Sequence, residues 1–200
     1  VNVAGNVTAT ADAGAITAGS LTVTSASGTV RLGAVTTSGA VNLTGGAIDL
    51  NGALAADGGV STSGTSFNSA STIDTVNNDV VINHSGNVVI GGAVTSGSGN
   101  LDVDSTGGTL SLNAAVSVST GNVNLDSFGV TTVAAAGDIT ATGASAVNFG
   151  AILGGALSTA GDVTTAAGAV SYNNAVTLTG NVAVDTGAGL GNIVFGSTVN

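Results

Sequence analysis

Short runs in which apolar residues alternate with other residues recur along the whole chain, and each run is closed by Gly or Asn. Seven of them read apolar, any residue, apolar, then Gly or Asn, at 30–33, 48–51, 88–91, 110–113, 147–150, 170–173 and 193–196. Most of the steps between successive runs are similar, and two are about twice as long. We interpret the steps as one period of about 18 to 23 residues in which two copies have degenerated, with a further match at 80–83 outside this register. Such a period is typical of a solenoid, in which one short unit is stacked many times.

The spacing within each unit predicts three short strands per coil. In six of the seven copies a second apolar run begins six residues after the first, and in one copy five residues after it. The second strands are expected to begin at Val35, Leu54, Val94, Val116, Leu153, Val176 and Val199. Third strands are expected six or seven residues later, at Val41, Leu101, Val123 and Val182. The closing Gly or Asn is expected to form a corner, because these residues enter left-handed backbone conformations at low cost.

These features predict an all-β fold, a right-handed parallel β-helix of about nine coils that forms one continuous segment over residues 1–200. The right-handed form is the general preference of parallel crossovers. We expect the segment to belong to a longer repetitive protein. An antiparallel β-sandwich also has short strands and frequent turns, but it does not predict a constant offset of six residues. If the register holds, one inner edge of the β-helix carries a column of Ile90, Leu112, Phe149, Tyr172 and Phe195.

Composition narrows the possible partners. The chain has 33 Gly and no Pro, and its apolar residues are mostly Val and Ala, so the core is expected to be narrow. All eleven acidic residues are Asp and the only Lys or Arg is Arg31, which gives a net charge of −10. Nucleic-acid binding is therefore excluded, because it needs Lys and Arg to neutralise phosphates. The chain also has no Cys that could form disulfides.

The repeat resembles that of the filamentous haemagglutinin family and of other β-strand-repeat bacterial adhesins. The matching segments include 28–32 (Gly-Thr-Val-Arg-Leu) and 121–125 (Gly-Asn-Val-Asn-Leu), and the pattern covers essentially the whole chain. The Asn-Pro motifs of that family's secretion domain are absent. The resemblance implies a shaft segment of a secreted or surface-bound filament.

Catalysis finds little support in the sequence. His84 is expected in a surface turn, and a single His in a chain without Cys or Glu cannot build a zinc site. No serine lies in the nucleophile motif G-x-S-x-G, and phosphate-binding loops are missing. Polysaccharide lyases share the β-helix fold, but they need basic residues beside carboxylates, and Arg31 alone does not provide them. We therefore expect no enzyme activity and no cofactor.

Three other kinds of site have some basis in the sequence. Asp104 and Asp126 occupy equivalent positions one period apart and, with Asp102, could share a calcium ion, although solvated Asp at corners is the commoner outcome. Ice binding needs a Thr array in nearly every coil. Only four T-x-T units occur, at 8–10, 22–24, 140–142 and 177–179. N-glycosylation sequons at Asn6, Asn42 and Asn83 are explained by the abundance of Ser and Thr.

The sequence thus predicts a non-catalytic structural shaft of an extracellular or cell-surface filament. Its partners would be adjoining solenoid segments or copies of itself joined end to end, and it would not span a membrane. The alternative is a binding module that recognises a host glycan or protein through one face. Phe67 and Phe128 are the aromatic candidates for that face, although both are expected to anchor loops on the rod.

Overall fold

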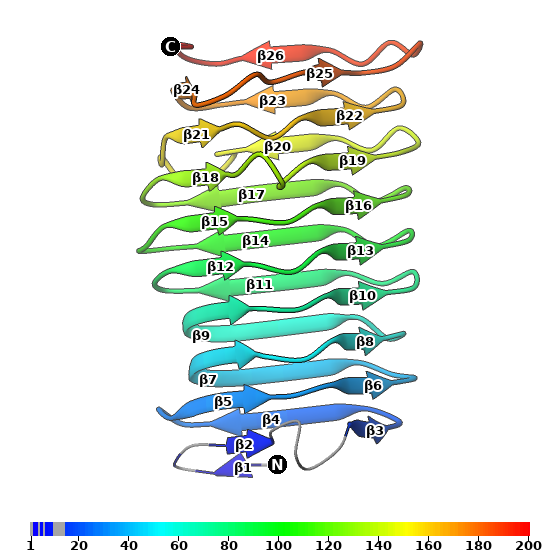
Figure 1. Cartoon of the computed structure of the whole chain (residues 1–200), viewed down its shortest axis with the longest axis vertical. Helices are drawn as coiled ribbons and strands as arrows, with labels where there is room; N and C mark the ends of the chain where they lie inside the picture. Colours follow the sequence, from blue (N-terminus) through cyan, green and yellow to red (C-terminus); the bar gives the residue numbers. More distant parts are fainter. Residues whose placement is uncertain (1, 4, 6, 10–14) are drawn as a thin grey trace.

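The computed structural model describes residues 2–3, 5, 7–9 and 15–200, and it forms a parallel β-solenoid in which the coils are stacked from the N-terminus to the C-terminus (Figure 1). Every strand pairs in parallel with its equivalent one coil away, which places the strands in three columns. Column 1 contains β1 (Asn2–Val3), β4 (Leu21–Ser25), the first halves of β7 (Val41–Leu50) and β9 (Val60–Ser69), β11 (Val80–His84), β14 (Leu101–Ser105), β17 (Val123–Ser127), β20 (Val147–Phe149), β23 (Val170–Tyr172) and β26 (Ile193–Phe195).

Columns 2 and 3 complete each coil. Column 2 contains β2 (Val7–Ala9), β5 (Thr29–Leu32), the second halves of β7 and β9, β12 (Val88–Ile90), β15 (Leu110–Leu112), β18 (Thr131–Val133), β21 (Leu157–Thr159) and β24 (Val176–Leu178). Column 3 contains β3 (Ile16–Ala18), β6 (Val35–Thr37), β8 (Leu54–Ala56), β10 (Ile73–Thr75), β13 (Val94–Ser96), β16 (Val116–Val118), β19 (Ile139–Ala141), β22 (Val163–Thr165) and β25 (Val184–Asp185). The nine-stranded sheet of column 3 confirms the predicted all-β parallel β-helix of about nine coils with three strands each.

The structure corrects the register of the seven sequence units. The units that begin at Val30, Ile48, Val88 and Leu110 lie in column 2, whereas those at 147, 170 and 193 lie in column 1. The unit at 80–83, which the sequence placed out of register, is an ordinary member of column 1. All three columns use the same apolar alternation, so the pattern alone does not tell one column from another.

One of the two apparent gaps in the period is filled by Phe67. In β9 this residue pairs with Ile48 on one side and with Val88 on the other, and it is only 1% exposed. The prediction that Phe67 anchors a loop is therefore wrong. In the run at 67–70, Ser69 stands in place of the second apolar residue and Ala70 in place of the closing Gly or Asn, which hid the run from the sequence pattern.

Two strands do not begin where the constant offset of six residues predicted, at Leu153 and Val182. Leu153 lies in a loop between β20 and β21, and the strand that pairs with β18 begins at Leu157. Val182 precedes its strand, which begins at Val184. Insertions at corners shift the strands without changing the stack, because pairing with the previous coil sets the register.

The core is a single apolar column within the coils. In most strands the first and third residues point inward and are buried, and the residue between them faces outward, as in the pattern of β12. Val, Ile and Leu fill most of the inward positions, which suits the narrow interior because β-branched side chains pack well on pleated strands. Ser or Thr takes several of the others, such as Thr37, Thr75 and Ser96 in column 3.

Three aromatic rings form a continuous stack inside the C-terminal coils. The rings of Phe149 and Tyr172 lie 5.1 Å apart at an interplanar angle of 3°, and those of Tyr172 and Phe195 lie 4.8 Å apart at 6°. This part of the predicted aromatic column is confirmed. Ile90 and Leu112 belong to column 2 instead, and the residue that pairs with Phe149 in the preceding coil is Leu125.

Most of the closing Gly and Asn residues do not adopt the left-handed backbone conformation that the sequence predicted. Among the described residues no non-Gly residue has a positive φ, and of the seven closing positions only Gly150 has one, at 66°. At Gly91 a glycine is required for another reason, the close approach of the neighbouring coil, because a Cβ there would lie 2.7 Å from the carbonyl oxygen of Ser69. The prediction of a left-handed corner is therefore wrong for most units.

At the corner that precedes column 1, hydrogen bonds between polar side chains and the backbone link successive coils. The Asp79 carboxylate accepts the backbone N–H of Asn100 at 2.7 Å, and the Asn100 side-chain oxygen accepts that of Asn122 at 2.8 Å. Asn122 in turn accepts the N–H of Ala146 at 2.8 Å. The ladder gives acceptors to backbone donors that the turn leaves without strand partners.

Asn100→Ala should lower the free energy of unfolding by about 1 kcal/mol, because the N–H of Asn122 loses its acceptor. Urea denaturation followed by circular dichroism measures this change. Ser117→Ala is the matched control, since Ser117 is exposed at the centre of β16 and makes no side-chain hydrogen bond. Equal stability of the two variants would show that the ladder contributes nothing.

Candidate functional site

Three carboxylates lie together on the outer face of column 1. Asp104 in β14 pairs directly with Asp126 in β17, as their equivalent positions in the sequence predicted. Asp102 lies two residues earlier on β14 and so shares the outer face with Asp104. The sequence therefore correctly brought these three residues together.

The carboxylates at this place lack compensating charge. Burial raises the pKa of Asp104, and the charges of Asp102 and Asp126 raise it further. Burial also raises the pKa of Asp102, with smaller contributions from Asp126 and Asp79. The Oδ1 atom of Asp104 is buried and has no hydrogen-bond donor.

Asp126 is covered by the loop that joins β20 to β21. Only 1% of Asp126 is exposed, and its Oδ1 accepts the backbone N–H groups of Ile152 at 3.1 Å and of Leu153 at 3.2 Å. The N–H of Gly155 also donates to the carbonyl of Ser127, at 2.9 Å. The coil below thus holds the loop at its middle and near its C-terminal end.

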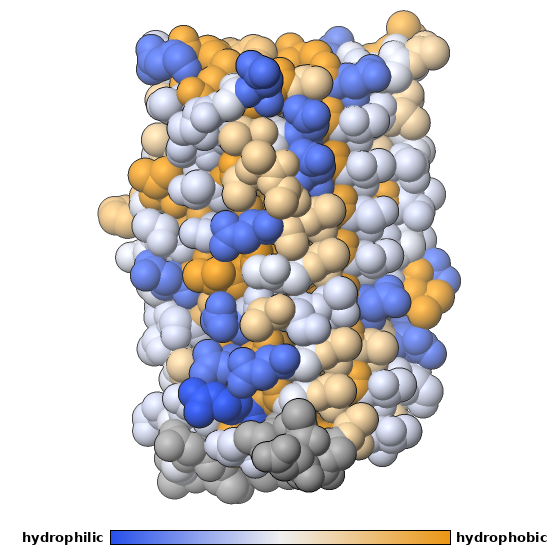
Figure 2. All heavy atoms as spheres, viewed as in Figure 1, coloured by the Kyte–Doolittle hydropathy of each residue, from blue (hydrophilic) through white to orange (hydrophobic). Residues whose placement is uncertain are grey.

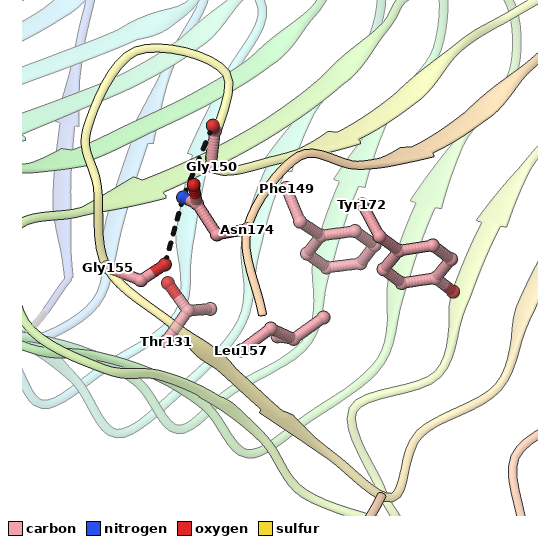
Figure 3. A pocket seen from close by; sticks show the side chains of 7 residues that line it. All are labelled: Thr131, Phe149, Gly150, Gly155, Leu157, Tyr172 and Asn174. Carbon is pink, nitrogen blue, oxygen red and sulfur yellow. Dashed lines mark hydrogen bonds between the residues drawn. The ribbon is translucent and has the colours of Figure 1, made fainter. Parts of the chain in front are cut away.

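Asn174 holds the same loop from the coil above (Figure 3). Its side-chain amide donates to the carbonyl oxygens of Leu153 at 2.9 Å and of Gly155 at 3.0 Å, and it lies 3.4 Å from that of Gly150. The space between Asn174 and the neighbouring rings of Phe149 and Tyr172 has no room for a water molecule. It is therefore packed structure and not a ligand cavity.

Exposed apolar side chains lie on this loop and on the corner of the coil below it. Ile152 is 80% exposed at its tip, Phe128 is 70% exposed just after β17, and Val130 is 43% exposed just before β18. We call these three residues the apolar corner. Phe128 was expected to pack on the rod, and the structure shows that its ring faces solvent instead. The aliphatic members were missed, because nothing in the sequence marks an exposed Ile or Val.

His84 lies inside the solenoid and not in a surface turn, so that prediction is wrong. It ends β11 and is fully buried, with its ring 5.5 Å from that of Phe67. Its Nε2 lies 3.0 Å from Thr62 Oγ1, whereas Nδ1 is buried without a partner. Burial lowers its pKa to about 4. The run at 83–86 resembles a turn because Asn, Ser and Gly surround the His, but β11 extends to His84.

The remaining sequence candidates are dispersed. Thr22 and Thr24 lie in column 1, Thr140 begins a unit in column 3, and Thr177 belongs to column 2, so these T-x-T units form no common array. Thr10 and the sequon at Asn6 lie outside the described residues. Asn42 and Asn83 are exposed on outer strand faces.

Two further kinds of feature are absent from the part of the chain that the structure describes. Within those ranges no group of three or more His, Cys, Asp or Glu side chains is arranged to hold a metal ion. None of the same residues builds a helix with the length and apolar character of a membrane span.

Comparison of the chain with models of protein families, with curated proteins and with solved structures gave no match.

Proposed function

We propose that this chain is a structural shaft of an extracellular or cell-surface filament and has no catalytic activity of its own. The regular stack supports the proposal, because each coil adds parallel backbone hydrogen bonds in three columns and extends one continuous core. The extracellular setting rests on the resemblance to filamentous adhesins. A stiff rod of this kind would hold another part of a protein at a distance from its anchor.

The observation that carries the proposal is the unbroken parallel pairing of column 1 from β1 to β26, which leaves the apolar edge of the last coil able to pair with a further coil. Ile193, Phe195 and Val199 are 43%, 47% and 45% exposed, although their equivalents one coil earlier are buried. Figure 2 shows apolar residues interspersed with polar ones at this end of the molecule, where β25 and β26 lie. A hollow of about 100 Å³ opens there between Tyr172, Val176, Leu178, Phe195 and Val199, among others.

A further coil, from an adjoining solenoid segment or from a second copy placed head to tail, would cover this surface. All strands of a column point the same way, so the first coil of one copy could pair in parallel with β26 of another and prolong the core. A contact of this heterologous kind does not close on itself and produces a filament. Because each copy carries a net charge of −10, assembly should increase with salt, which screens the repulsion.

Analytical ultracentrifugation and negative-stain electron microscopy of the 200-residue protein test the proposal. The protein should form linear assemblies whose length grows with concentration and with salt. Ile193→Asp combined with Phe195→Asp should reduce assembly by about tenfold or more, because unpaired charges would be buried at the junction.

The control is Thr95→Asp, which adds a charge to the exposed middle of β13, far from the last coil. It should assemble as the parent protein does. A parent protein that stays monomeric at all concentrations and salt levels, or assembly that the two end substitutions leave unchanged, would contradict end-to-end stacking.

The second candidate function is a binding module that uses one side of the rod. The exposure of Phe128, and of Ile152 on the loop at 150–156 that both neighbouring coils hold, favours it.

A further inference from the structure

The loop at 150–156, between β20 and β21, is the longest corner between columns 1 and 2 in the described part of the chain. The coil that runs from Thr131 to its column 2 partner Leu157 is longer than the coil before it, which runs from Leu110 to Thr131. The extra residues are shared among the three corners of this coil. The corner at 150–156 is the longest of them, because β20 ends after 3 residues where β17 has 5, and it projects over β17 between columns 1 and 2.

Hydrogen bonds from both neighbouring coils fix the position of this loop. Asp126 and the carbonyl of Ser127 bind its backbone N–H groups from the coil below, and Asn174 binds its carbonyls from the coil above. Gly155 allows the close approach, because a Cβ there would overlap the carbonyl oxygen of Gly129. The anchored backbone therefore presents Ile152 to solvent in a defined position, with its N–H bound to Asp126, two residues before Phe128.

Ordering a loop around an exposed apolar side chain gives the isolated rod little stability, since Ile152 buries almost none of its surface. A partner that covers Ile152, Phe128 and Val130 would remove their apolar surface from water, and a loop already ordered would lose little further entropy on binding.

The charge beside the apolar corner indicates the kind of partner. Asp104 pairs with Asp126, the residue to which the backbone of Ile152 is bound, and Asp102 shares its face. Asp104 Oδ1 has no donor in the described structure. The only Lys or Arg of the chain, Arg31, is paired with Asp49 at 2.9 Å on strands β5 and β7. A positive group at Asp102 and Asp104 must therefore come from another molecule.

We propose that the apolar corner, together with Asp102 and Asp104, is a docking surface for a protein segment in which Lys or Arg alternates with apolar side chains. The apolar residues would pack on Phe128, Val130 and Ile152, and the basic residue would bind the two carboxylates. This inference rests on the second candidate function and does not depend on end-to-end assembly.

Two other occupants fit the surface less well. A second copy of the chain would bring its own Asp102, Asp104 and Asp126 against these carboxylates, and like charges repel. A glycan would use the ring of Phe128, but Ile152 and Val130 offer it no hydrogen bonds. A glycan is therefore an outcome for the test to detect.

Isothermal titration calorimetry tests the proposal with a short synthetic peptide of alternating leucine and arginine. The protein carries Ile193→Asp and Phe195→Asp, so that assembly does not compete with binding. Two matched peptides, one with serine in place of leucine and one with glutamate in place of arginine, separate the apolar and charged contributions. Both should bind at least about tenfold more weakly than the parent peptide.

Variants locate the site on the surface. Phe128→Ser combined with Ile152→Ser should weaken binding of the leucine–arginine peptide about tenfold or more. Asp104→Asn should weaken it and reduce its salt dependence, because a charge pair is lost. Thr95→Ala, on the exposed face of column 3, should change nothing. Circular dichroism verifies that each variant is folded.

The proposal is overturned if the leucine–arginine peptide does not bind, or if the serine–arginine peptide binds equally well, which would show attraction to the overall negative charge. It is also overturned if the substitutions at 104, 128 and 152 leave binding unchanged. Glycan-array binding that depends on Phe128, without peptide binding, would assign the surface to a glycan instead.

Discussion

Tyr172→Ala is expected to destabilise the C-terminal coils by about 3–5 kcal/mol, the usual cost of removing a buried aromatic ring. Tyr172 is only 3% exposed and stacks between Phe149 and Phe195. The truncation would leave a cavity in the narrow core that the three strands of each coil enclose, and both neighbouring rings would lose their stacking partner. Small side chains elsewhere in the solenoid cannot fill such a space, because backbone pairing fixes the distance between coils.

Two measurements check this result. The midpoint of urea denaturation should fall, and amide hydrogen exchange should accelerate first in β20, β23 and β26, whose core positions contain the stack. Exchange that accelerates equally in β7 and β9 would contradict a local role of the stack.

Tyr172→Phe is the matched control, and it should raise the free energy of unfolding where Tyr172→Ala lowers it. The Tyr172 hydroxyl is buried without a hydrogen-bond partner, and burial raises its pKa to about 12. Removing the hydroxyl keeps the ring stack and relieves the desolvation cost of an unpaired polar group, so stability should rise by about 1 kcal/mol. A loss of stability in this variant would show that the hydroxyl has a partner, such as a bound water.

Acid should destabilise the solenoid through His84. Burial lowers the pKa of His84 in the folded protein to about 4 from its usual value of 6.5. Between these two pH values the unfolded chain binds a proton that the folded protein does not. The free energy of unfolding should therefore fall as the pH decreases through 6.5 towards 4, by about 3 kcal/mol in total.

The physical reason lies in the surroundings of the ring. Protonation would place a second N–H at Nδ1, which has no acceptor, beside the apolar ring of Phe67. Thr62 Oγ1 satisfies only Nε2. A cation at this position would be buried in the core without a counter-charge.

Urea denaturation of the parent protein and of His84→Gln at pH values of about 7.5, 5.5 and 4 measures this contribution. Gln has no titrating group, and its amide can bond to Thr62, so the variant should lose less stability than the parent protein on acidification. Asp102 and Asp104 have raised pKa values, for which acid favours the folded state, and they are present in both proteins. Parallel pH profiles for the two proteins would contradict the role of His84.

The candidate surface was only partly visible in the sequence. The regular period correctly placed Asp104 beside Asp126, because both lie in coils of ordinary length. The role of Asp126 and Asn174 in holding the loop at 150–156 was not predictable, since the two residues are far apart in the sequence and both contact the loop only after three coils have stacked. The loop itself was misread, because Leu153 stands six residues after Val147 and imitates the start of a strand.

The sequence by itself determined the parallel β-solenoid, the number of coils and the three strands in each, because apolar alternation and a short regular period leave few other ways to bury the apolar positions. Only the tertiary structure decided which column each run joins, since the same alternation serves all three columns and pairing with the preceding coil selects among them. It also decided that His84 and Phe67 lie in the core and that Phe128 and Ile152 lie outside. The side on which a residue falls depends on where its strand ends and its corner begins, and the neighbouring coils set that boundary.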